Sequence, residues 1–147
     1  MAFIGFFGDT PDALHRLHVR ASYLYAPVLH LSLSGAFALA YSTDACTELS
    51  SFPMPRLTVA LDGACGGQES LLNVSRLYLR HGRRMRNRLL APVAFAICDV
   101  RKNLVLLGAT YGRRCYVEEE ERGFWFSSDP ALLRAPCSVE LAVLKKK

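Results

Sequence analysis

The sequence predicts an α+β domain built mostly of antiparallel strands. Short apolar runs bounded by turn residues recur along the chain, and hairpin-length connections join most of them. Two segments instead carry apolar residues at helical spacing, and strands separate these two segments from each other. The length of 147 residues suits a single domain over residues 1–147 with a sizeable core.

The N-terminal segment predicts a strand followed by a helix. Residues 2–7 are apolar and end at Gly8, as expected of a buried strand. Residues 9–11 (Asp-Thr-Pro) form a helix start, because a capping residue precedes a proline in the first turn. The helix continues over residues 13–20, where Leu14, Leu17 and Val19 form a partial apolar face.

Residues 21–41 require a test for a membrane span, because they carry no formal charge over 21 residues. The interior of this segment holds Pro27 and His30, and VLHLSLS alternates apolar and polar residues. That alternation is typical of a half-exposed strand. We therefore expect two paired strands joined by a tight turn, and no membrane association.

The middle of the chain predicts a loop, a strand and a second helix. Residues 44–55 are rich in Ser, Thr and Pro and predict a loop, and residues 57–61 form a strand that stops at the turn dipeptide Asp62-Gly63. Apolar residues at helical spacing predict a helix over 68–81, which Gly82 ends.

The C-terminal part predicts two hairpins and a short helix. The expected strands are 92–100, 103–107, 114–117 and 123–127. Residues 118–121 (four Glu) form the solvated tip of the second hairpin, and Asp129 caps a helix that ends at Leu133. Residues 134–147 are expected to be a C-terminal tail or a truncated linker.

Charge and cysteine content restrict the functional classes. The net charge is +5, and one arginine run supplies six charges, so the rest of the chain would sit at −1 (5 − 6). The run predicts either a solvated loop or contacts with an anionic partner, and nucleic acid is not favoured because aromatic residues are not interleaved with it. Its members are Arg76, Arg80, Arg83, Arg84, Arg86 and Arg88.

Five cysteines without a C-x-x-C spacing argue against a disulfide framework and a zinc site. Together with the lack of a secretory signal, they lead us to expect a reducing, cytoplasmic location.

The usual catalytic motifs are missing from the sequence. It contains no Walker phosphate loop, dinucleotide-binding glycine motif, H-E-x-x-H or G-x-S-x-G. His15 and His18 lie three residues apart, but no third metal ligand lies nearby in the sequence. We therefore expect neither a metal ion nor a cofactor.

Three stretches resemble the class II glutamine amidotransferase (glutaminase) domain of the asparagine synthetase family. They are MAFIGFFGD with ALHR after it, LTVALDGACGGQESLL, and the long segment from LLAPVAFAICDV to FWFSSDPALL. In the family these places hold Met-Cys-Gly-Ile, a strand followed by Asn-Gly-Glu, and paired strands that end in Phe-Ala-Ser-Glu. The resemblance covers roughly residues 1–134. It implies an N-terminal nucleophile hydrolase fold, a four-layer αββα sandwich.

The departures from the family pattern fall on the chemistry. The family uses a Cys at residue 2 as the nucleophile that attacks the glutamine amide, and here Ala2 stands in that place. The oxyanion-hole pair Asn-Gly is Asp62-Gly63, and an ionised Asp62 would repel a developing oxyanion. The family's arginine for the glutamine carboxylate has no counterpart, because no Arg occurs between Arg20 and Arg56.

Three functional hypotheses follow. The first is a glutaminase-like domain without catalysis, acting as a structural or regulatory module that binds a synthetase-type partner or itself, with glutamine as a further candidate ligand. The second is an active amidotransferase subunit with a non-standard nucleophile, for which Cys65 with His15 as base are the candidates. The third is a basic module that binds an acidic partner or nucleic acid through the arginine run.

Overall fold

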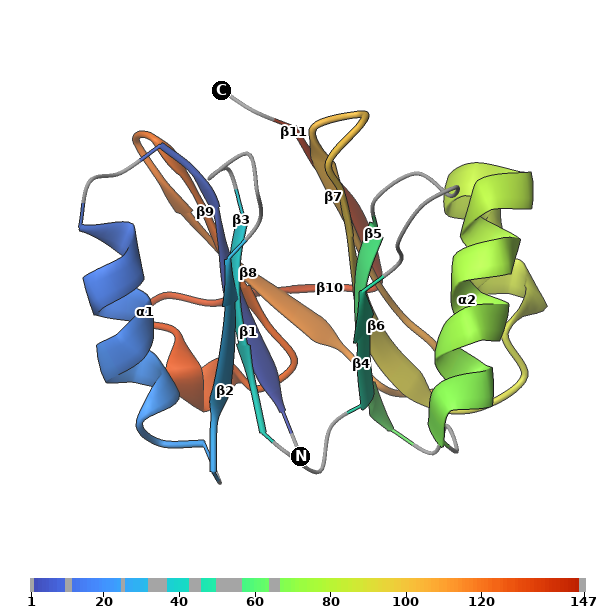
Figure 1. Cartoon of the computed structure of the whole chain (residues 1–147), viewed down its shortest axis with the longest axis horizontal. Helices are drawn as coiled ribbons and strands as arrows, with labels where there is room; N and C mark the ends of the chain where they lie inside the picture. Colours follow the sequence, from blue (N-terminus) through green and yellow to red (C-terminus); the bar gives the residue numbers. More distant parts are fainter. Residues whose placement is uncertain are drawn as a thin grey trace.

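The computed structural model of the chain consists of four layers (Figure 1). Two β-sheets face each other, helix α1 (Ala13–Ala21) covers the outer face of one, and helix α2 (Gly67–His81) covers the outer face of the other. The predicted α+β class and the αββα layering implied by the resemblance are both observed. The structure describes residues 2–9, 12–24, 26–31, 37–42, 46–49, 57–63 and 67–145.

The sheet beneath α1 has six strands, and all its pairings are antiparallel. In spatial order they are β10 (Cys137–Val139), β8 (Cys115–Glu120), β9 (Gly123–Ser127), β1 (Phe3–Gly8), β3 (Phe37–Tyr41) and β2 (Val28–Leu31). The pairing of β2 with β3 confirms the strand pair predicted for residues 21–41. No helix in the described part of the chain is long and apolar enough to cross a bilayer.

The sheet beneath α2 has five antiparallel strands. In spatial order they are β11 (Leu141–Lys145), β7 (Leu104–Ala109), β6 (Val93–Asp99), β5 (Leu57–Gly63) and β4 (Cys46–Leu49). A 3₁₀ helix, η1 (Gly82–Arg88), follows α2, and a second one, η2 (Pro130–Leu132), follows β9.

Alternation along the strands builds the core between the layers. In β1, Phe3 and Phe7 pack against the facing sheet, while Ile4 and Phe6 pack beneath α1. Trp125 of β9 lies in the same outer cluster and is fully buried. Successive side chains of a strand point to opposite faces, so a strand that is apolar throughout fills two cores at once.

Several predicted boundaries are corrected by the structure. The predicted loop over 44–55 contains strand β4, and β5 runs through Asp62-Gly63 instead of stopping before them. Asp9 does not cap α1, because the helix begins at Ala13 and the residue before it is Asp12, which makes no side-chain cap bond. The Asp9 backbone amide instead donates to the Arg122 carbonyl at 3.2 Å.

The C-terminal segments also differ from the sequence interpretation. The cap of the short helix is confirmed, since the Asp129 carboxylate accepts from the Ala131 amide at 2.9 Å. The stretch expected to be a tail contains β10 and β11, which lie at one edge of each sheet. The basic run continues α2 as η1 rather than forming a loop.

Glu118 is a buried residue of β8 rather than part of a solvated tip. Its side chain is 9% exposed, and its carboxylate accepts from the Arg134 amide at 2.6 Å and from the Arg20 guanidinium at 3.1 Å. Burial alone would raise the pKa of Glu118, but these hydrogen bonds bring it below its ordinary value. This carboxylate therefore holds α1 and the segment after η2 against the sheet.

The fold should lose stability in acid through this network. The pKa of Glu118 is lower in the folded state than in the unfolded state. The ionised side chain therefore contributes fully to the free energy of unfolding above the unfolded-state pKa, and this contribution is lost as the pH falls through the folded-state pKa. We expect the Tm to decline from about pH 5 downwards, as measured by circular dichroism. Glu118→Gln should lower the Tm at pH 7 and flatten this decline, whereas Glu121→Gln, at an exposed position, should change neither. Equal pH profiles for the two variants would contradict the assignment.

Candidate active site

A pocket of about 590 Å³ lies where the C-terminal end of β5 meets the segments after β7 and β9. Three structural elements supply polar groups to it, and the walls include proline and glycine backbone. The lining residues are Asp62, Gly63, Pro92, Gly112, Arg113, Arg114, Tyr116, Ser128, Asp129 and Pro130. The two residues predicted as the remnant of an oxyanion hole, Asp62 and Gly63, therefore do lie in a pocket.

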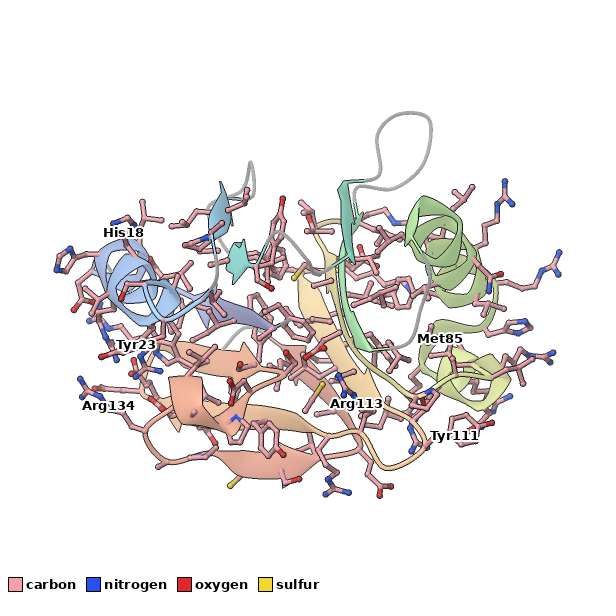
Figure 2. The ribbon with its side chains drawn as sticks, turned by 90° about the horizontal axis from the view of Figure 1, so that it is seen from below. His18, Tyr23, Met85, Tyr111, Arg113 and Arg134 are labelled. Atoms are coloured by element: carbon pink, nitrogen blue, oxygen red, sulfur yellow. The ribbon has the colours of Figure 1, made fainter. Side chains whose placement is uncertain are left out.

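The central charge pair of the pocket joins Asp62 and Arg113. A terminal guanidinium nitrogen of Arg113 lies 2.7 Å from the Asp62 Oδ1. The Asp62 side chain is 7% exposed and the Arg113 side chain is 41% exposed. Figure 2 shows Arg113 between the strands of the two sheets. The positive charge of the guanidinium compensates the negative charge of Asp62. The sequence analysis expected Asp62 to repel a developing oxyanion and did not identify this partner.

The remaining polar groups of the pocket are held in place. Arg114 donates to the Ser138 hydroxyl at 2.6 Å and to the Glu140 carboxylate at 2.8 Å. The Ser128 hydroxyl accepts from the Phe3 amide at 3.1 Å. The wall is therefore fixed by bonds to β1 and to the segment around β10, and the exposed part of the Arg113 guanidinium offers a positive charge to a small ligand.

Ala2 lies immediately before β1, and its neighbour in the sequence contacts the pocket wall. Residue Phe3, next to it, exchanges two hydrogen bonds with Ser128 of the pocket wall. Ala2 is 6% exposed and packs in the cluster beneath α1, and its amide nitrogen donates to the Ser42 hydroxyl at 3.1 Å. A methyl group offers no electron pair, so this position supplies no side-chain nucleophile.

Gly63 is required by backbone packing. A Cβ built on Gly63 would lie 2.4 Å from the Pro92 carbonyl oxygen, and φ is +150°. Only glycine occupies such a conformation without strain. The presence of glycine in the pocket wall is therefore explained by the close approach of β5 and β6.

The candidate base and the two buried thiols do not line this pocket. His15 is exposed on α1, on the far side of the six-stranded sheet from β5 (Figure 1). Burial raises the pKa of both the Cys98 and the Cys115 thiol to about 12, which keeps them protonated and unreactive. Cys65 falls outside the described residues, so its pairing with His15 stays a prediction.

The arginine run lies away from this pocket, on α2 and η1 in the outer layer of the five-stranded sheet. Five of its members are exposed. Arg86 differs, because its Nε donates to the Ala109 carbonyl at 2.7 Å and a terminal nitrogen lies 3.6 Å from Glu140.

Arg113 is the site residue that sequence reasoning missed. The family pattern placed an arginine on a strand near the N-terminus, and here the guanidinium comes from the turn after β7. The Arg113-Arg114 dipeptide in the sequence was the available signal. Its partner Asp62 lies 51 residues away in the chain, so no local sequence pattern indicates that the two side chains form an ion pair.

The comparisons with known proteins agree with the layering. No protein-family model and no curated protein sequence matches the chain. Among solved structures, glutamine phosphoribosylpyrophosphate (PRPP) amidotransferase from B. subtilis, in complex with ADP and GMP, matches with a TM-score of 0.66 and 12% identity. The match covers 100% of this chain and 49% of that protein, so the chain spans about half of its length. At this identity the likeness shows a glutamine-amidotransferase-like fold.

Proposed function

We propose that the chain is a glutaminase-like domain that does not hydrolyse glutamine and serves a synthetase-type partner as a structural or regulatory module. The observation that carries the proposal is Ala2, whose buried methyl group lies immediately before β1, where the resembled family has its nucleophile. The structural likeness to a glutamine amidotransferase supports the fold part of the proposal.

Two further features support the loss of catalysis. Asp62 occupies the place of the oxyanion-hole asparagine, and its carboxylate is engaged by Arg113 at 2.7 Å. A carboxylate is an acceptor only, so it cannot donate a hydrogen bond to a developing oxyanion as an amide does. Of the described cysteines, Cys98 and Cys115 are buried, and Cys137, which is exposed on β10, does not line the pocket.

A second candidate function is glutamine binding without turnover. The partly exposed guanidinium of Arg113 favours it, because arginine pairs well with carboxylates. The cavity of about 590 Å³ is large enough for an amino acid.

The proposal predicts that the purified chain releases no ammonia from glutamine above a protein-free blank. Titration calorimetry with ammonia followed in the same cell measures binding and turnover together. Ala2→Cys, which restores the family's nucleophile, should also stay at the blank, because Asp62 and Arg113 remain where a neutral amide donor is needed.

Each result of this titration has one meaning. Heat of binding without ammonia supports the second candidate function, and no heat supports a purely structural or regulatory module. Ammonia release by the unmodified chain would overturn the proposal. Release by Ala2→Cys alone would show that only the nucleophile has been lost.

A further inference from the structure

The outer surface of α2 and η1 carries an unbalanced positive charge. The sequence contains no Asp or Glu from residue 70 to residue 98. Among the described residues, no ion pair involves five of the exposed arginines. These five, here called the arginine face, are Arg76, Arg80, Arg83, Arg84 and Arg88. Their mutual repulsion is a cost that an anionic partner would relieve.

His81 lies beside the arginine face and has a lowered pKa. Partial burial together with the charges of Arg88 and Arg80 lowers the pKa of His81 below its ordinary value. Figure 2 shows nitrogen-tipped side chains extending outward from α2, away from the sheets. The arginine face is therefore open to another molecule.

A hollow of about 530 Å³ lies on the same face of α2. It is lined by Asn73, Arg76, Leu77, Leu79 and Arg80. Leucine side chains thus form part of the wall, with two guanidinium groups beside them. Arg76 and Arg80 are four residues apart on a helix, which spaces them by about 6 Å along the axis. A ligand that fits this face has an apolar anchor flanked by carboxylates.

We propose that the arginine face and its hollow bind an acidic amphipathic helix of a protein partner. Carboxylates four residues apart on that helix meet Arg76 and Arg80, and an apolar side chain between them enters the hollow. The proposal goes beyond the proposed function and does not depend on it, because this face lies apart from the pocket that holds Arg113.

Three observations favour a protein segment over nucleic acid. The aromatic residue of α2 and η1, Tyr78, is 5% exposed and is therefore not placed to stack on a base. The leucines of the hollow give an apolar contact that a phosphate backbone does not use. Charge outside the arginine run is nearly balanced, so the rest of the surface adds little attraction for a polyanion.

The test measures fluorescence anisotropy of a labelled helical peptide of about 16 residues, with Glu at four-residue spacing and Leu on the same face. Arg76→Glu with Arg80→Glu should weaken binding about tenfold or more, since two attractions become repulsions. Arg76→Gln with Arg80→Gln should weaken it by a smaller factor, and this milder pair guards against loss of folding, which circular dichroism checks. A peptide with Ala in place of Leu should also bind more weakly.

Controls separate specific docking from general attraction. Arg122→Glu with Arg134→Glu makes the same change of net charge at exposed positions outside α2 and η1, and it should alter binding less than twofold. Equal weakening by the two double variants would overturn the proposal. So would tighter binding of a single-stranded RNA of about 20 nucleotides than of the peptide, with a steep loss between about 50 and 200 mM salt.

Discussion

Replacing Trp125 by alanine should lower the free energy of unfolding by about 4 kcal/mol, a large part of the total for a domain of this size. Trp125 is fully buried and packs on Phe6 with ring centroids 4.9 Å apart. The Arg20 guanidinium lies 4.3 Å from its ring centroid, and the indole N–H donates to the Glu120 carboxylate at 3.0 Å. The variant therefore leaves a cavity and removes the surface on which the α1 arginines rest.

Urea unfolding followed by far-ultraviolet circular dichroism measures this effect, because Trp125 is the only tryptophan of the chain and its fluorescence disappears with it. Tyr23→Ala provides the aromatic control. Tyr23 is 83% exposed, so its loss should change the free energy of unfolding by less than about 0.5 kcal/mol. Similar losses in the two variants would show that α1 and the six-stranded sheet do not share the packed core described above.

The strands of the core could be predicted because their signal is local. Residues 2–7 and 93–98 contain no polar side chain, as expected of strands buried on both faces, and the structure buries them between the sheets and the helices. The cap at Asp129 was equally local, since Asp-Pro at a helix start satisfies free amides within two residues.

Features that depend on distant partners could not be predicted in this way. Glu118 looks solvated within a run of four glutamates, and only the approach of Arg20 and of the Arg134 amide makes its burial favourable. The site shows the same limit. Asp62 and Gly63 correctly indicated where the pocket lies, but the sequence did not indicate that Arg113 supplies its positive charge. Arg113 contacts Asp62 only in the folded structure, because the two residues are distant in the sequence.

Gly63→Ala should lower the free energy of unfolding by about 4 kcal/mol. The cause of this loss shows whether packing alone requires glycine at this position of the candidate site. The new Cβ would meet the Pro92 carbonyl oxygen at 2.4 Å and the Val93 Cα at 2.8 Å, which are backbone atoms at the start of the strand paired with β5 and of the residue before it. The strain of φ = +150° adds to this overlap. Urea unfolding gives the loss, and Gly82→Ala gives the matched comparison.

Gly82 has φ = +59°, but a Cβ there would meet nothing within 4 Å, so only the left-handed conformation costs energy, about 1 kcal/mol. A difference of about 3 kcal/mol between the two variants would measure the overlap with the β6 side of the pocket wall together with the greater backbone strain at φ = +150°. Gly63 then has a packing reason to be glycine whether or not its amide ever faced an oxyanion. If the two variants lost equal stability, the β5–β6 contact would not explain Gly63, and a role for its amide in ligand binding would have to be tested directly.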